Sequence, residues 1–279
     1  MKFIFFYKYI YMKKLLITFG SHDNYIDAGK RIINQAKNTN IFTHLTLYTL
    51  DDLKNDNYFW NRHHKFITEN KRGTGYWIWK PYLIKKNMEN MNNGEILLYI
   101  DSGCEISKKE KNYLLQCIEK VKTDKIIGTI AYENYIHKAI EKKWNKKDLI
   151  VKLGMNNTNF IDSPQRQASV ILFLVCDETR ALVNEWYELC CDYHNVDDSP
   201  SIILNYPSFK EHRHDQSIFS LLTKKYNLFS SISLDNKCIK VIRNRTGQSK
   251  LYMYEIAYLI IFIVIVIIIY NLLFYLFLT

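Results

Sequence analysis

The side chains best suited to chemistry gather in four short segments of this 279-residue chain. In one, an apolar strand expected at residues 95–100 stops at Asp101, followed by Ser102 and Gly103. Ligands of open α/β sheets bind beyond the carboxyl ends of strands, where this carboxylate would lie. It would supply one hard oxygen to a divalent cation, with diphosphate oxygens filling further positions. The alternative is that Asp101 only caps the helix that follows.

A second segment, residues 72–81, has two glycines followed by two tryptophans. The glycines predict a mobile loop that can approach a base or ribose, with Tyr76 and Trp77 beside the nucleotide. Arg72 and Lys80 can meet phosphate charge. A single Gly-x-Gly is weak support, and the tryptophans are equally suited to a core.

A third segment, residues 162–169, leads directly into an apolar strand expected at 170–175. Polar side chains crowd the start of this buried strand, where a surface turn would need only a few. They offer donors and acceptors for sugar hydroxyls, so the expected sugar or acceptor contacts are Gln165, Arg166, Gln167 and Ser169. The alternative is a solvated loop.

The fourth segment, residues 212–217, opens a helix with more hydrogen-bonding side chains than a cap requires. Asp215 is suited to act as a general base on an acceptor hydroxyl, or to hold a sugar hydroxyl. We group Gln216 and His214 with it as catalytic residues, and either His212 or His214 is suited to contact phosphate or metal. A simple cap at the helix N-terminus is the alternative for Asp215.

Strand-like and helix-like segments alternate through the middle of the chain, which predicts an α/β fold with a mostly parallel sheet. Strands are expected at 15–19, 43–50, 95–100, 125–131, 170–175 and 238–242, the last closing the sheet. Helices are expected at 25–36, 81–91 with Pro81 first, 108–121, 178–193 and 215–225. Residues 51–74 are interpreted as an excursion over the sheet, and residues 132–162 as basic and irregular.

Composition indicates a globular protein with an anionic partner. Hydrophobic residues make up 48% and the formal net charge is +10, which suits a nucleotide, an acidic glycan or lipid headgroups. Nucleic acid is not expected, because the lysines are dispersed and no helix-turn-helix, RNP or zinc-finger pattern accompanies them. Six cysteines without a CxxC pair indicate reduced core thiols, which favours a cytosolic catalytic domain.

The two ends differ from the expected catalytic domain at 13–250. Residues 256–278 carry no charge and are long enough to span a bilayer as a single-pass anchor, the alternative being a buried core helix. Arg243, Arg245 and Lys250 precede this segment, so the positive-inside rule places the domain in the cytosol. Residues 1–12 are interpreted as an extension rather than a signal peptide, with Met12 as an alternative start.

Taken in order, the four segments resemble the nucleotide-diphospho-sugar transferase (GT-A) fold. The resemblance is closest to bacterial and viral glycosyltransferase-like proteins with GYWIWKP, LLYxDxGC and HDQS segments, and it covers roughly residues 13 to 245. It implies that a divalent cation, Mn²⁺ or Mg²⁺, and the diphosphate bind at Asp101 and Gly103. It also implies a sugar pocket at residues 165–169, donor or acceptor contacts at Asp215 and Gln216, and a nucleoside site at Thr18, Gly20 and Ser21.

The sequence also departs from that pattern. The acidic DxD strand end has become Asp101-Ser102-Gly103, with one carboxylate, and no late histidine follows residues 238–242. The expected function is a membrane-anchored, hexosyltransferase-type glycosyltransferase. It would move a sugar from a nucleotide-diphosphate donor to a hydroxyl of a glycan, lipid or protein. The alternative is a catalytically degenerate, tail-anchored protein that binds nucleotide-sugars or glycans.

Overall fold

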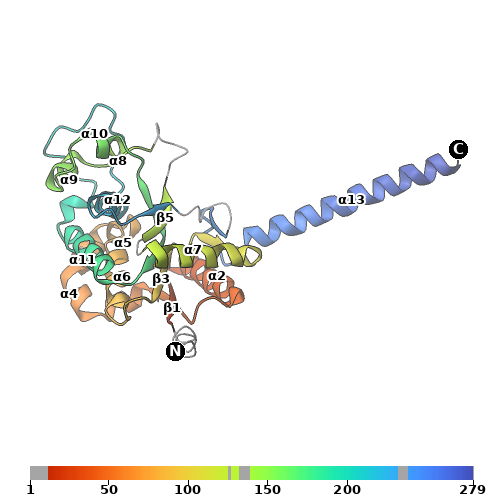
Figure 1. The fold of residues 1–279 in the computed structure, drawn as a ribbon, viewed down its shortest axis with the longest axis horizontal. Coiled ribbons are helices and arrows are strands. Elements are labelled where there is room, and N and C mark those ends of the chain that lie inside the picture. Colours follow the sequence, from red (N-terminus) through yellow and green to blue (C-terminus); the bar gives the residue numbers. More distant parts are fainter. Residues whose placement is uncertain (1–11, 125–126, 132–138, 232–237, 279) are drawn as a thin grey trace.

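The computed structural model describes residues 12–124, 127–131, 139–231 and 238–278. It has a six-stranded sheet with helices on both faces and one long C-terminal helix that projects away (Figure 1). The expected α/β class is therefore confirmed. The strands of this sheet are β1 (Lys14–Gly20), β2 (His44–Thr49), β3 (Ile96–Ile100), β5 (Ile127–Ala131), β6 (Arg166–Leu174) and β7 (Ser230–Ser231). The expected extension at 1–12 lies outside the described residues, apart from Met12.

The strand order is β2-β1-β3-β6-β5-β7, and β6 runs antiparallel to both of its neighbours. The other pairs, β1 with β2, β1 with β3 and β5 with β7, are parallel. Reversal of β6 places its beginning beside the end of β3. Ile100 pairs with Val170, and the Asp101 backbone N–H donates to the Ser169 carbonyl at 2.8 Å. The polar residues before β6 therefore lie beside Asp101.

The alternation of side chains along each strand builds one core on each face of the sheet. In β1, Leu15, Ile17 and Phe19 face one core, and Leu16 faces the other. The first core receives α4 (Asn57–Glu69), α6 (Trp79–Met88), α11 (Asp177–Cys191) and α12 (Asp215–Lys225). The second receives α2 (Asp23–Thr39) and α7 (Lys111–Asp124). The six cysteines, all within the described ranges, form no disulfide.

Several expected boundaries differ from the structure. The excursion at 51–74 contains α3 (Leu50–Lys54) and α4, and side-chain caps at Thr49 and Asp56 start these two helices. Helix α6 begins at Trp79, two residues before Pro81. Strand β6 begins at Arg166, because its polar residues already pair with the sheet. The described part of 132–162 contains three short helices, α8 (Glu141–Trp144), α9 (Lys147–Lys152) and α10 (Thr158–Ile161).

The last expected strand does not close the central sheet. Instead β8 (Ile239–Val241) pairs antiparallel with β4 (Cys104–Ile106) in a separate two-stranded sheet. This pairing carries the chain back past the turn after β3, where the Asn244 backbone N–H donates to the Gly103 carbonyl at 2.8 Å. The segment after β8 is therefore a neighbour of Asp101.

Buried Arg31 fastens these two segments together. Its Nη2 donates to the carbonyls of Ser102 at 2.8 Å, Cys104 at 2.9 Å and Asn244 at 3.1 Å. A guanidinium has its donors in a fixed plane, which suits it to hold several carbonyls from separate segments. Arg31 thus links helix α2, the turn after β3 and the segment after β8.

Glu105, which is fully buried, caps the C-terminal helix α13 (Lys250–Leu278) from a distant part of the sequence. Its carboxylate accepts the backbone N–H groups of Lys250 at 2.9 Å and Leu251 at 3.2 Å. Burial raises the pKa of Glu105, but hydrogen bonds, first from Ser249 and Asn244, bring it below its ordinary value. The negative charge of Glu105 is also stabilising near a helix N-terminus, because the helix dipole is positive there. The start of α13 is therefore fixed to the folded domain.

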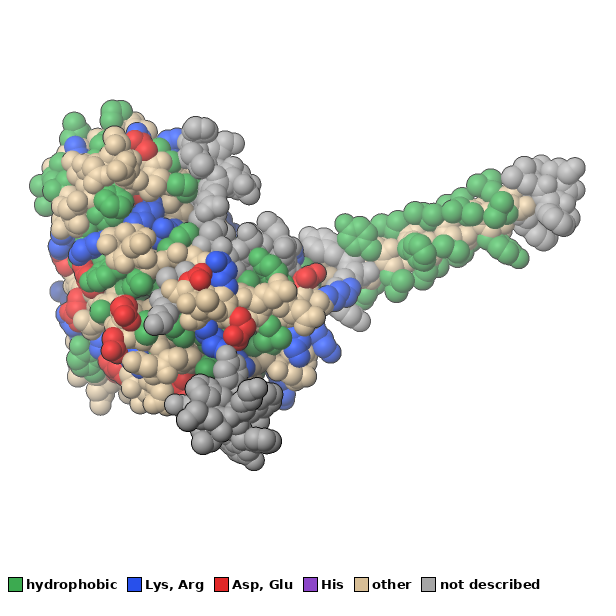
Figure 2. Space-filling view, in the orientation of Figure 1, with side chains coloured by type: hydrophobic (Ala, Val, Ile, Leu, Met, Phe, Trp, Pro, Cys, Tyr) green, Lys and Arg blue, Asp and Glu red, His purple; other side chains and the backbone are tan. Residues whose placement is uncertain are grey.

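On the face visible in Figure 2, the described side chains of helix α13 are mainly apolar. Its stretch Ile256–Leu273 is long and apolar enough to cross a membrane, and none of that stretch is buried against the rest of the described chain. The expected apolar C-terminal helix is present.

Replacing Glu105 by alanine should destabilise the fold, because several buried donors would lose their acceptor. We expect a loss of about 2–4 kcal/mol in the free energy of unfolding. Denaturant titration of the full chain in detergent measures it. Glu110→Ala, at an exposed position nearby, is the matched control and should change stability by about 0.5 kcal/mol or less. Equal effects of the two substitutions would contradict the capping role.

Candidate functional site

A cavity of about 750 Å³ lies at the carboxyl ends of β1 and β3 and the beginning of β6. All four segments chosen from the sequence contribute to its wall. The expected site residues that line it are Ser21, Arg72, Trp77, Lys80, Asp101, Ser102, Gly103, Gln165, Gln167, Ser169, His214, Asp215 and Gln216. These residues come from five separate stretches of chain, which the reversed β6 and the start of α12 bring to one edge of the sheet.

An ammonium group between two carboxylates forms part of the cavity wall. The Lys80 Nζ lies 2.8 Å from Asp215 Oδ2 and 3.6 Å from Asp101 Oδ1, and it donates to the Ala168 carbonyl at 3.1 Å. The Tyr99 hydroxyl donates to Asp101 Oδ1 at 2.5 Å. Burial alone lowers the pKa of Lys80, but Asp101 and Asp215 raise it above its ordinary value. Lys80 is therefore a charged partner for both acids.

The two carboxylates differ in their surroundings. The Asp101 side chain is 35% exposed, whereas that of Asp215 is 5% exposed. Burial raises the pKa of Asp215 to about 6, against the opposing effect of Lys80. Asp215 is thus a carboxylate that changes charge near neutral pH, a property suited to general acid–base chemistry.

The glycine-rich segment before Lys80, expected as a mobile loop, forms a left-handed turn. Residues 73–77 all have positive φ, including the non-glycine residues Thr74 at 54°, Tyr76 at 51° and Trp77 at 62°. A run of left-handed non-glycine residues is unfavourable and persists only where surrounding contacts enforce it. Here the Trp79 indole N–H donates to the Gly73 carbonyl at 2.9 Å. The turn presents Trp77 and Lys80 to the cavity.

His214, the residue before α12, also has a strained backbone, with φ 55° and ψ −128°. Its Nδ1–H donates to the Val196 carbonyl at 2.6 Å, and its ring stacks on Tyr76 at a centroid distance of 4.9 Å. These contacts fix the imidazole at the cavity wall. The strain and the contacts together set the direction in which the chain enters α12, and so the position of Asp215.

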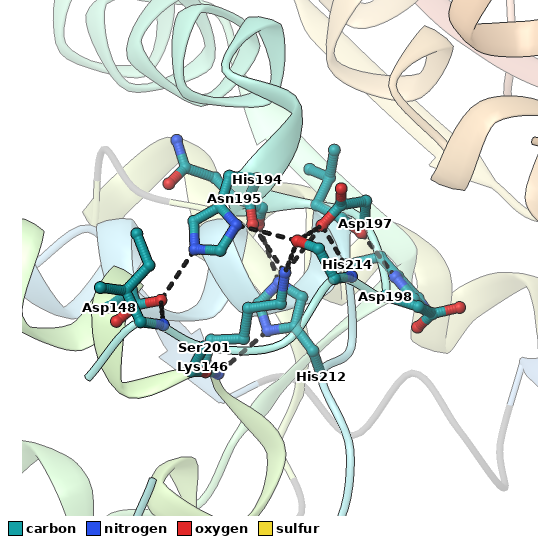
Figure 3. Close-up of polar contacts among 12 residues, drawn as sticks. Lys146, Asp148, His194, Asn195, Asp197, Asp198, Ser201, His212 and His214 are labelled. Atoms are coloured by element: carbon teal, nitrogen blue, oxygen red, sulfur yellow. Dashed lines mark hydrogen bonds and ion pairs between the residues drawn. The ribbon is translucent and has the colours of Figure 1, made fainter. Parts of the chain in front are cut away.

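A buried polar network lies behind His214 (Figure 3). The Lys146 Nζ donates to the His194 carbonyl and to Asp197 Oδ1, both at 2.8 Å. His212 Nδ1 accepts the Lys146 backbone N–H at 3.1 Å, so its Nε2 carries the proton donated to the Asn195 carbonyl at 2.8 Å. Burial lowers the pKa of His212 to about 3. His212 is therefore a neutral supporting residue and does not line the cavity.

Alternation along β6 divides its polar residues between two sides. Gln167 and Ser169 line the cavity together with Gln165, whereas Arg166 does not. The Arg166 guanidinium instead lies 3.5 Å from the centroid of the Phe229 ring. The Gln216 Nε2 donates to Gln165 Oε1 at 2.7 Å, which joins α12 to the segment before β6.

Three other expected site residues also lie outside the cavity lining. Thr18 is 1% exposed within β1, and Tyr76 packs against His214. Gly20 has a packing role, because a Cβ there would lie 2.6 Å from the Tyr25 carbonyl oxygen at the start of α2. Their neighbours Phe19, Ser21, His22 and Tyr25 line the cavity instead.

The sequence interpretation missed several cationic and aromatic residues of the cavity wall. Among the described residues, the cavity lining contains two carboxylates, those of Asp101 and Asp215. It also contains six Lys and Arg side chains: Lys71, Arg72, Lys80, Arg213, Arg243 and Arg245. The guanidinium of Arg245 lies 5.5 Å from the centroid of the Tyr25 ring, and that of Arg213 lies 4.3 Å from the centroid of the Trp144 ring. Arg243 and Arg245 had been interpreted only as flanks of the C-terminal segment.

The described residues do not fit a divalent cation at this site. They contain no group of three or more His, Cys, Asp or Glu side chains placed to hold a metal ion. Asp101 brings one carboxylate, and a charged ammonium already lies 3.6 Å from it. Mg²⁺ usually takes one or two protein carboxylates, and substrate phosphates and water complete its six ligands. Here the more exposed carboxylate, Asp101, already contacts Lys80 and Tyr99, so it is a poor ligand for the cation expected from the sequence.

No protein-family model and no curated protein matches this chain. Among solved structures, the chain is similar to the bifunctional glycosyltransferase WbbM, with TM-score 0.43, 11% identity and coverage of 80% of this chain and 39% of that one. Mouse xyloside xylosyltransferase 1 gives TM-score 0.43, 13% identity and coverage of 80% and 85%. The galactosyltransferase LgtC, with donor and acceptor sugar analogues, gives TM-score 0.38, 15% identity and coverage of 74% and 70%. Similarity at this level assigns no family to the chain.

Proposed function

We propose that this protein is a glycosyltransferase of GT-A-like architecture that takes a sugar from a nucleotide-diphosphate donor. The observation that carries the proposal is the composition of the wall of this cavity. Aromatic rings such as Tyr25 and Trp77 suit a base, and cationic side chains suit a diphosphate. The amides of Gln165 and Gln167, together with Asp101, suit sugar hydroxyls. A nucleotide-diphosphate sugar presents a group that suits each of these three surfaces.

The transfer step uses the two sides of this cavity. The acceptor oxygen forms a bond to the anomeric carbon, the bond from that carbon to phosphate breaks, and its electron pair leaves on the diphosphate. Asp215 takes the acceptor proton, with Gln216 and His214 holding its helix start in place. Arg243 and Arg245 offset the charge that develops on the leaving group.

The donor would lie along the turns after β1 and β3. Ser21, Ser102 and Gly103 offer small groups beside which a ribose or diphosphate can approach closely, and Arg72 adds charge. Gln165, Gln167 and Ser169, at the start of β6, suit the transferred sugar or the acceptor. Helix α13 would anchor the domain in a membrane, with the basic residues before it on the cytosolic side. The acceptor would be a hydroxyl of a glycan, lipid or protein.

Binding of nucleoside diphosphates to the full chain in detergent tests this function. We expect UDP or GDP to bind with micromolar affinity by calorimetry, and the double variant Arg243→Ala/Arg245→Ala to weaken that binding by about 10- to 100-fold. Lys65→Ala is the matched control, since Lys65 is an exposed cation on α4 outside the cavity lining. Affinity should be unchanged in this control.

Two results would change the assignment. If UDP, GDP and their sugar conjugates all fail to bind, the donor site is absent and the proposal is refuted. If a nucleotide-sugar binds but is neither hydrolysed nor transferred to any offered acceptor, the alternative of a non-catalytic nucleotide-sugar binder is supported.

A further inference from the structure

Contacts within the folded protein fix the position of the Lys80 ammonium group. Its backbone N–H donates to the Trp77 carbonyl at 2.9 Å at the end of the left-handed turn. Trp79 beside it stacks on Phe19 with ring centroids 3.9 Å apart. The Lys80 side chain is 4% exposed, and its Nζ lies 5.2 Å from the centroid of the Tyr99 ring. The ammonium is therefore held in one place before any ligand arrives.

Three oxygen-bearing groups surround the ammonium. Ala168 offers a carbonyl at 3.1 Å, Asp215 an oxygen at 2.8 Å and Asp101 an oxygen at 3.6 Å. A divalent cation that approached Asp101 would meet this fixed positive charge at short range, in a partly buried site where charges are poorly screened. The Tyr99 hydroxyl donates to the same oxygen of Asp101 that lies nearest the ammonium.

We propose that Lys80 is a built-in cation that takes the place of a divalent metal ion between Asp101 and Asp215. The charge of the donor diphosphate would then be met by Arg243 and Arg245, both exposed on the cavity wall, without a bridging metal. The statement about the donor rests on the proposed function. The statement that the two carboxylates take Lys80 instead of a metal ion does not depend on it.

Mn²⁺ titration of the full chain, followed by electron paramagnetic resonance, tests the Lys80 position directly. The wild-type protein should bind no Mn²⁺ at the carboxylate pair, either alone or with UDP present. Lys80→Ala leaves both acids without their counter-charge and should gain one Mn²⁺ site, which the added substitution Asp101→Ala removes. Lys85→Ala, on the same helix and paired with Glu89, should behave as wild type. A Mn²⁺ ion that binds wild-type protein and is lost in Asp101→Ala overturns the proposal.

Calorimetry with UDP and GDP, in excess EDTA and then in Mn²⁺, tests the consequence for the donor. We expect the same affinity in both conditions, whereas a metal-bridged diphosphate would bind about tenfold or more tightly with Mn²⁺, a coupling typical of two linked ligands. Such tightening contradicts the proposal. If neither nucleotide binds in either condition, the proposed function fails, and the Mn²⁺ titration still decides the role of Lys80. If Lys80→Ala does not fold, the Mn²⁺ titration of the wild-type protein still tests the proposal.

Discussion

Replacing Asp101 by alanine should lower sugar transfer by about 10²- to 10³-fold, the range found when one preorganised polar group of an active site is removed. Asp101 is the more exposed of the two carboxylates in the cavity wall, and Tyr99 and Lys80 fix its orientation. Without it, donor hydroxyls lose a charged acceptor, and Lys80 keeps Asp215 as its one acidic partner. Initial rates of donor hydrolysis and of transfer measure the loss.

The control separates loss of chemistry from loss of fold. Asp124→Ala removes an exposed carboxylate at the end of α7, where it pairs with Lys120 at 3.0 Å, and should leave turnover unchanged. Thermal unfolding of Asp101→Ala should resemble wild type closely enough that the protein is folded at the assay temperature. Turnover that survives in a folded Asp101→Ala protein would refute the role of this carboxylate.

Most strands and helices could be predicted because their signals are local. Runs of apolar residues gave β1, β3 and much of β6, and helical spacing gave α2, α11 and α12. The direction of β6 could not be predicted, since an apolar run has the same pattern whichever way it pairs. A parallel β6 would have placed Gln165 and Gln167 at the edge of the sheet far from Asp101. The reversal is set by pairing with β3 and β5.

The parts of the site that the sequence did not predict depend on contacts between distant residues. Arg243 and Arg245 reach the cavity wall because β8 pairs with β4 and because Arg31 bonds to carbonyls of both segments. Lys80 could be selected as a cation near phosphate. Its two acidic partners, however, lie far along the chain, at Asp101 and Asp215.

The backbone strain in the left-handed turn before Lys80 could not be predicted from the sequence either. Gly73 and Gly75 indicate that positive φ is allowed near residue 74, but Thr74, Tyr76 and Trp77 carry it as well. Nothing in the type of these residues favours a left-handed conformation. The turn forms because its neighbours, among them Trp79, supply contacts that outweigh the strain. Such strain is typical of functional sites, and here it lies beside Lys80 and Asp215.

Asp215→Asn should lower transfer by about 10²- to 10⁴-fold, the usual contribution of a general base. The amide keeps the shape of the side chain and its place at the start of α12 but cannot take a proton. Lys80 would retain Asp101 as an ionic partner, so the fold should survive. An asparagine variant with wild-type turnover at neutral pH would show that the base lies elsewhere.

The pH dependence of transfer is a second, independent test of Asp215 as the general base. Burial raises its pKa to about 6, with Lys80 opposing and Asp101 adding to the shift, so wild-type activity should fall below about pH 6 rather than near 4.

The raised pKa of Asp215 also affects the stability of the protein. Because the folded state holds this proton more tightly than the unfolded state, where the pKa is 3.8, its stabilisation is present at low pH and is lost as the pH rises through 6. The stability of wild type relative to Asp215→Asn should therefore fall by about 1.4 kcal/mol per pH unit between the unfolded pKa of 3.8 and the folded pKa of about 6, and stay level above it. A flat difference would mean that Asp215 has the same pKa in the folded and the unfolded protein and titrates as an ordinary carboxylate.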